Sequence, residues 1–278
     1  MTKKYLFRLC AGLPALTSGK ETLSMTHATS NPSSTTRKIS PVRKQYILRL
    51  IFRCFALVLS VILLFVYPQA FRILEGNRFF TELSPFHLLW VLWMVDMLPQ
   101  IIPMKNSVAL GSQKVFARRF RPANQPVDPA VLKKHIQKAN WGALKVLGLW
   151  LLLVGAIGAL YFCRVIDAKW LLVFSVAFYV CDLICVLIWC PFRLIMGNRC
   201  CTTCRIFNWD HMMMFSPLVF VGGFFSISLV AMAILALLVW EISMLRYPER
   251  FSETTNAALR CAQCTDKLCT QYCQKRRK

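Results

Sequence analysis

Five long apolar stretches constrain this chain more than any other feature, because each is about as long as a membrane is thick. A helix needs about 20 residues to cross ~30 Å of hydrocarbon, and apolar runs of that length are rare in soluble domains. Of the 278 residues, 56% are hydrophobic and only 17% are charged, which leaves little material for a water-facing surface. The sequence therefore predicts an all-α protein that crosses a membrane several times. The five predicted transmembrane helices cover residues 46–67, 85–103, 141–163, 170–190 and 214–240.

Polar segments divide the chain into three parts. Residues 1–44 are predicted to form a disordered basic tail, because residues 26–40 are mostly Ser, Thr, Asn and Pro. The first residues resemble a weak signal peptide, and translation from Met25 instead of Met1 would explain them equally well. Residues 45–245 are the predicted transmembrane domain, and residues 246–278 are a short basic tail rich in cysteine.

The charge of the chain is strongly positive, with 34 Lys and Arg against 12 Asp and Glu. In a soluble protein this excess would indicate nucleic acid. Here the basic residues flank apolar stretches, so the lipid bilayer and its anionic headgroups are the expected partners and nucleic acid is not. The predicted location is the cell membrane, as a multi-pass protein. The distribution of Lys and Arg favours five spans over four by a narrow margin, and the stretch at residues 85–103 is the one in question.

The stretch at residues 214–240 determines on which faces of the membrane the cysteines lie. It is long enough for one tilted span and too short for two, although Pro217 and Gly222-Gly223 interrupt it. One span would place Cys204 and Cys264 on opposite faces, whereas a re-entrant loop would place them on the same face. Because a re-entrant backbone must be buried in protein, we predict one span and two separate cysteine sites.

Two polar clusters hold seven of the 13 cysteines and are candidate metal sites. A Cys-x-x-Cys spacing lets two thiolates bind one metal ion or form a disulfide, and four cysteines match a closed zinc site or an iron–sulfur cluster. The alternative is redox-inert or palmitoylated cysteines beside the membrane. The first cluster is Cys200, Cys201 and Cys204, and the second is Cys261, Cys264, Cys269 and Cys273.

Two carboxylates, Asp96 and Asp182, lie inside predicted spans. A carboxylate at the centre of a transmembrane helix costs about 2.5–3.5 kcal/mol on insertion scales, so it usually faces a partner or a cavity. A proton or cation path is one interpretation, and a hydrogen bond that fixes helix packing is the other. Arg53, near the start of the first span, is expected to extend toward the membrane surface.

One region resembles a known group of proteins. The run Cys190-Pro191-Phe192 is followed by Asn198-Arg199-Cys200-Cys201-x-x-Cys204-Arg205-Ile206-Phe207-Asn208-Trp209-Asp210, and later by Pro248-Glu249-Arg250-Phe251. This pattern is similar to uncharacterised multi-pass membrane proteins of anaerobic Gram-positive bacteria. The resemblance covers roughly the last third of the chain and implies no assigned activity.

The sequence leaves three functional hypotheses. The first is a membrane protein whose cysteine clusters bind zinc or an iron–sulfur cluster in a structural or redox role. The second is a small ion or solute transporter that uses Asp96 and Asp182, and the third is a non-catalytic membrane scaffold. The sequence shows no phosphate-binding loop, dinucleotide fingerprint, nucleophile elbow or metalloprotease helix motif, and whether the chain is an enzyme stays open.

Overall fold

The structure is a computed structural model, and it confirms the all-α prediction. Its described residues belong to one compact unit, and the regular elements among them are α- and 3-10 helices. An isolated antiparallel bridge joins Pro122 to Asn256. The structure describes residues 40–102, 112–123, 128–197, 201, 203–260 and 268.

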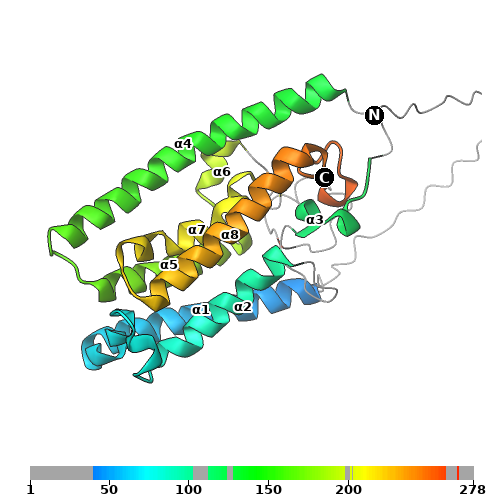
Figure 1. The fold of residues 1–278 in the computed structure, drawn as a ribbon. Coiled ribbons are helices and arrows are strands. Elements are labelled where there is room, and N and C mark those ends of the chain that lie inside the picture. The colour runs from blue at the N-terminus through cyan, green and yellow to red at the C-terminus, as the bar shows by residue number, and fades with distance from the viewer. Residues whose placement is uncertain are drawn as a thin grey trace, which may run out of the picture. The chain divides into compact units, whose positions relative to one another are not determined.

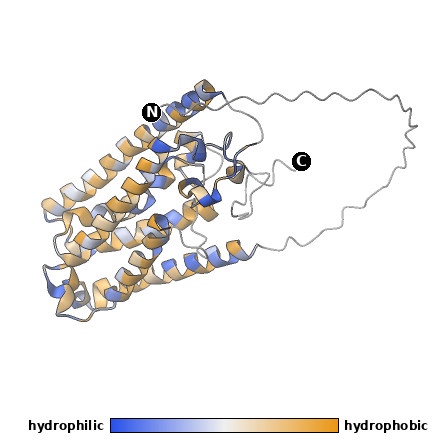
Figure 2. Ribbon diagram, turned by 45° about the vertical axis from the view of Figure 1, so that its right-hand side comes forward, coloured by the Kyte–Doolittle hydropathy of each residue, from blue (hydrophilic) through white to orange (hydrophobic). Residues whose placement is uncertain are grey.

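Four described helices are long and apolar enough to cross a membrane, so the chain has the architecture of a multi-pass membrane protein. They are α1 (Pro41–Val66), α4 (Pro129–Phe162), α5 (Ala168–Leu187) and α8 (Phe224–Arg246). Helix α2 (Phe86–Ile101) is apolar but shorter. Figure 2 shows the helices hydrophobic along most of their length, with hydrophilic residues gathered toward their ends.

Local sequence explains where the long helices begin. Ser40 caps α1 by accepting a hydrogen bond from the Arg43 N–H at 3.2 Å, and Asp128 caps α4 by accepting one from the Ala130 N–H at 2.9 Å. Both caps are followed by proline in the first turn, where a missing N–H costs nothing. Helix α4 therefore starts well before its apolar part and continues without a break into the span.

The apolar stretch at residues 214–240 is not one helix. It is divided into α7 (Asp210–Phe215), the 3-10 helix η5 (Ser216–Phe220) and α8. Pro217 lies at the start of η5, and Gly223 has a φ of +104°, a conformation that favours glycine. A Cβ at Gly223 would also lie 2.5 Å from the Leu74 carbonyl oxygen. The prediction of a single helix is therefore wrong, because the chain at Gly223 packs closely against the end of the 3-10 helix η1 (Pro68–Leu74) and the chain just after it.

The break makes α7 and η5 a separate pass between the two ends of the helix bundle (Figure 1). At one end, the Arg205 guanidinium pairs with the Glu241 carboxylate, which joins the residues before α7 to the last turns of α8. At the other end, the Phe224 N–H donates to the Gly76 carbonyl oxygen at 3.1 Å. The chain therefore runs from the end that holds Arg205 to the end that holds Gly76 through α7 and η5, and it returns through α8.

Basic residues are very unequally divided between these two ends. We call the end that holds Arg205 and Glu241 the basic end. The opposite end holds only Arg72, Arg78, Arg164 and Lys169 among the described Lys and Arg residues. Arg53 and Lys145 lie within helices between the ends, and the other described ones belong to the basic end: Arg43, Lys44, Arg49, Lys114, Arg118, Arg119, Arg121, Lys133, Lys134, Lys138, Arg193, Arg205, Arg246, Arg250 and Arg260.

Candidate functional site

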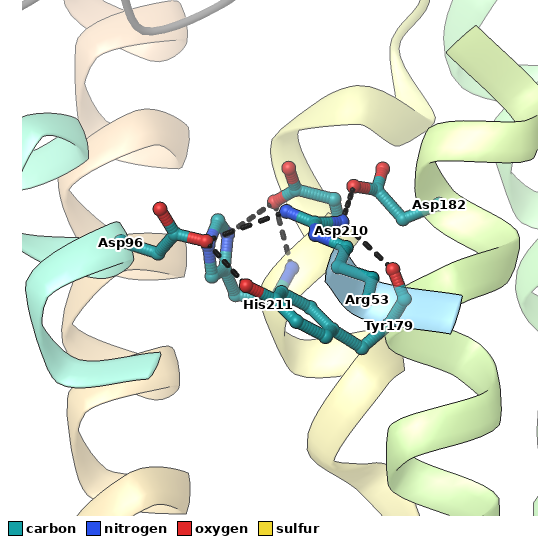
Figure 3. A network of polar contacts seen from close by, with 6 residues as sticks. All are labelled: Arg53, Asp96, Tyr179, Asp182, Asp210 and His211. Carbon is teal, nitrogen blue, oxygen red and sulfur yellow. Dashed lines mark hydrogen bonds and ion pairs between the residues drawn. The ribbon is translucent and has the colours of Figure 1, made fainter. Parts of the chain in front are cut away.

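A buried charged network joins the two predicted intramembrane carboxylates. Arg53 on α1 is only 7% exposed, so the expectation that it extends to the membrane surface is wrong. Its Nη1 donates to Asp182 Oδ2 at 2.9 Å, and its Nη2 donates to Asp96 Oδ2 at 3.4 Å. Helices α1, α2 and α5 thus converge on one guanidinium (Figure 3). The arrangement follows from the cost of a lone charge in an apolar environment, because each charge finds its partner on another helix.

Tyr179 on α5 contacts both Arg53 and Asp96. Its hydroxyl donates to Asp96 Oδ2 at 2.7 Å, and its carbonyl oxygen accepts from Arg53 Nη1 at 2.7 Å. The guanidinium carbon of Arg53 also lies 3.6 Å from the centre of the Tyr179 ring. A cation over an aromatic face is attracted to it, so Tyr179 fixes both the arginine and the Asp96 carboxylate.

The start of α7 adds two more titratable residues to the cluster. His211 Nδ1 lies 2.7 Å from Asp210 Oδ1, and the His211 side chain is buried. Figure 3 shows both residues beside Arg53, between Asp96 and Asp182. The break after α7 makes this placement possible, because it brings a short helix into the bundle in front of α8.

The network contains more acidic than basic groups. Asp96, Asp182 and Asp210 are three carboxylates, whereas Arg53 and His211 supply at most two positive charges. An uncompensated charge in a buried site is costly, so a proton or a cation is needed to balance the third carboxylate.

A partly open cavity of about 260 Å³ adjoins the network. Asp182 and Asp210 belong to both, so the cavity reaches the carboxylates directly. Aromatic residues form much of its wall. Five of the seven described cysteines line it: Cys181, Cys185, Cys190, Cys201 and Cys204.

Three of these thiols lie close together. The Cys185 and Cys190 side chains are hydrogen-bonded to each other, and Cys201 Sγ lies 3.5 Å from the Cys185 carbonyl oxygen, to which it donates. The hydrogen bond from the Cys185 thiol lowers the pKa of Cys190 to about 6. Burial opposes this shift, whereas backbone N–H groups at the start of α6 (Phe192–Met196) and the Arg193 charge reinforce it. Of the two hydrogen-bonded thiols, Cys190 is therefore the one that ionises more readily.

Only some of the predicted metal ligands are among the residues that the structure describes. Cys201 and Cys204 line the cavity, but no group of three or more His, Cys, Asp or Glu residues in the described part of the chain is arranged to hold a metal ion. The remaining predicted ligands, Cys200, Cys261, Cys264, Cys269 and Cys273, lie outside the described residues.

One described residue of the tail packs at the basic end. Leu268, which lies between Cys264 and Cys269 in the sequence, packs with Tyr46, Leu183, Val186 and Leu187. These are residues of the basic end, where Cys201 and Cys204 also lie. The cysteines of the second cluster lie outside the described residues, so the prediction that the two clusters occupy opposite faces stays a prediction.

Sequence reasoning found Asp96 and Asp182 but not the residues that join them. Arg53 carried a usable signal, since a charge of opposite sign inside another apolar stretch is the expected partner of a buried carboxylate. No comparable signal marked Tyr179.

Comparison with known proteins adds no constraint on this site. No protein-family model, curated protein or solved structure matches the chain. The resemblance in the last third of the sequence stays a prediction.

Proposed function

We propose that this protein binds a proton or another small cation at the Arg53 network and transfers it across the membrane. Asp96 and Asp182 are the acceptor carboxylates. The observation that carries the proposal is the network itself: three half-buried carboxylates gather around a buried arginine and a buried histidine, next to a cavity. A cation path of this kind is a known use of carboxylates inside membrane spans.

The cation reaches the network through the cavity. Asp182 and Asp210 line the cavity, so a cation that enters there meets carboxylate oxygens before any other part of the network. Tyr179 then links this side to Asp96 through its hydroxyl. The proton or cation can pass from Asp182 to Asp96 without leaving the group of residues that Arg53 holds together.

Buried polar atoms continue beyond the network into the apolar core. Trp93 Nε1, Ser175 Oγ and Ser226 Oγ are buried and have no hydrogen-bond partner among the described residues. They come from α2, α5 and α8, and the Trp93 ring packs against Tyr179 with centroids 5.7 Å apart. Buried polar atoms normally have partners, so these three are suited to contact water or a cation in transit.

Flux through proteoliposomes tests the proposal. We expect Asp182→Asn and Asp96→Asn each to lower proton or alkali-cation flux at least about tenfold, the effect of a barrier raised by about 1.4 kcal/mol. A pH-sensitive dye and an alkali-cation dye inside the vesicles identify the ion. The matched control is Asp167→Asn, which removes a carboxylate that is 72% exposed at the opposite end. Wild-type vesicles without flux, or full flux in both network variants, would contradict the proposal.

A second candidate function is metal binding at the basic end. It is favoured by the packing of Leu268, a residue of the tail, against the start of α1 and the end of α5. Four clustered thiolates suit Zn²⁺ or an iron–sulfur cluster, in a structural or redox role. The tail cysteines Cys261, Cys264, Cys269 and Cys273 supply that number by themselves.

Metal content of the full chain, purified anaerobically in detergent, tests this second candidate. We expect close to one zinc ion per chain, or iron with sulfide and visible absorbance. The double variant Cys261→Ser, Cys264→Ser should lose the metal, because two of four ligands are gone, whereas Cys54→Ser should keep it. Metal-free wild-type protein with freely alkylated tail thiols would rule the candidate out.

A further inference from the structure

The thiols of the cavity form a chemical site that neither proposed function uses. Cys185 belongs to the last turns of α5, and Cys190 follows α5 directly before Pro191 and α6. Their side chains share a hydrogen bond, so the two thiols are neighbours in the cavity wall. Both face the cavity, and both are free cysteines.

We infer that Cys185 and Cys190 form a reversible dithiol–disulfide site that reacts with small organic disulfides entering the cavity. Cys190 is the attacking group, because the thiolate is the nucleophile in thiol–disulfide exchange, and Cys190 lines the cavity beside the N–H groups that begin α6 and the Arg193 charge, which favour its thiolate. Cys185 is the resolving thiol, because it lines the same cavity and its side chain is hydrogen-bonded to that of Cys190.

The exchange proceeds in two balanced steps. The Cys190 thiolate attacks one sulfur of the small disulfide, a mixed disulfide forms, and the first small thiolate leaves. Cys185 then gives its proton to the departing thiolate and attacks the sulfur of Cys190, and the second small thiolate leaves. Two protein thiols are oxidised to one disulfide, and one small disulfide is reduced to two thiols.

The shape of the cavity limits which disulfides can react. Its volume of about 260 Å³ accommodates a compact molecule, and Trp150, Phe178 and Phe192 contribute apolar wall. The Arg193 side chain also lines the cavity and offers positive charge near Cys190. We therefore expect small neutral or anionic disulfides to react faster than bulky or cationic ones.

A third thiol lies within reach of the pair. Cys201 Sγ donates to the backbone of Cys185, so it adjoins the same end of α5. A disulfide between Cys185 and Cys190 would tie the last turns of α5 to the chain before α6. It would change the wall of the cavity directly beside Asp182.

Oxidation of the purified full chain by hydroxyethyl disulfide, with the thiols mapped by mass spectrometry, tests the inference. In the wild-type protein we expect a peptide linked through Cys185 and Cys190, and its disappearance after dithiothreitol. Cys54 and Cys163 are exposed thiols outside the cavity and serve as controls that gain at most a mixed disulfide. Because the readout is covalent and needs no flux or metal, its result is independent of both proposed functions.

Two variants assign the roles of the thiols. Cys185→Ser should leave Cys190 as a stable mixed disulfide, since the resolving thiol is missing. Cys190→Ser should slow modification of Cys185 at pH 7 at least about tenfold, because an ordinary thiol is only a few per cent ionised there. If Cys185 and Cys190 both remain alkylatable after oxidation of folded wild-type protein, or if the disulfide forms elsewhere, the inference is wrong.

Discussion

A membrane-impermeant maleimide applied to intact cells is expected to label Cys163 and to leave Cys204 unlabelled until the membrane is permeabilised. Cys163 is exposed where α4 ends, at the opposite end of the bundle. Cys204 lies at the basic end, where its carbonyl oxygen accepts a hydrogen bond from Lys114 Nζ at 3.2 Å. The expected difference in labelling is all-or-none, because the two positions lie on different sides of the membrane.

The charge distribution predicts that the basic end faces the cytoplasm. Cytoplasmic loops of membrane proteins carry the excess of Lys and Arg, and short loops close to the spans count most. The opposite end has only four of these residues in its described part, Arg72, Arg78, Arg164 and Lys169. Cytoplasmic thiols are normally kept reduced, so disulfides there are transient or serve redox sensing, and clustered cysteines more often bind metal.

A single-site control makes the labelling experiment decisive. Cys163→Ser should abolish the signal from intact cells, since the other exposed described thiols, Cys54 and Cys181, lie within the spans α1 and α5. Permeabilised cells carrying the same variant should then show labelling at the basic end. Labelling of Cys204 in intact cells, with Cys163 protected, would reverse the orientation.

The break in the apolar stretch at residues 214–240 is only partly predictable from the sequence. The stretch has the length of one span, and length and composition indicate a single helix there. What makes α7 and η5 a separate pass is a tertiary contact, the packing of Gly223 against the chain at Leu74 and Gly76. The proline and the two glycines mark the break, but nothing in the sequence shows which part of the chain packs against it.

The site was predictable to a different degree on each helix. Asp96 and Asp182 were predicted because a carboxylate in an apolar stretch stands out by itself. The role of Arg53 depends on which helices are neighbours, and α1 packs beside α5 although more than 100 residues separate them along the chain.

Arg53→Met is expected to destabilise the protein strongly, by about 3–5 kcal/mol, the usual cost of removing one partner from a buried ion pair. Methionine keeps much of the side-chain volume, so the loss comes from Asp96 and Asp182, which would stay buried without their shared cation. For a protein of this size the loss corresponds to a fall in Tm of about 10 °C. Thermal unfolding in detergent, followed by tryptophan fluorescence, measures it.

Two further variants separate a loss of charge pairing from a general loss of packing. Arg49→Met makes the same substitution one turn earlier on α1, where the side chain is exposed, and should change Tm little. The triple variant Arg53→Met, Asp96→Asn, Asp182→Asn removes the unpaired charges together with the arginine. It should regain much of the lost stability, because replacing a buried ionic group as a whole is far cheaper than breaking it. A triple variant as unstable as Arg53→Met would show instead that the arginine acts through its packing on Tyr179.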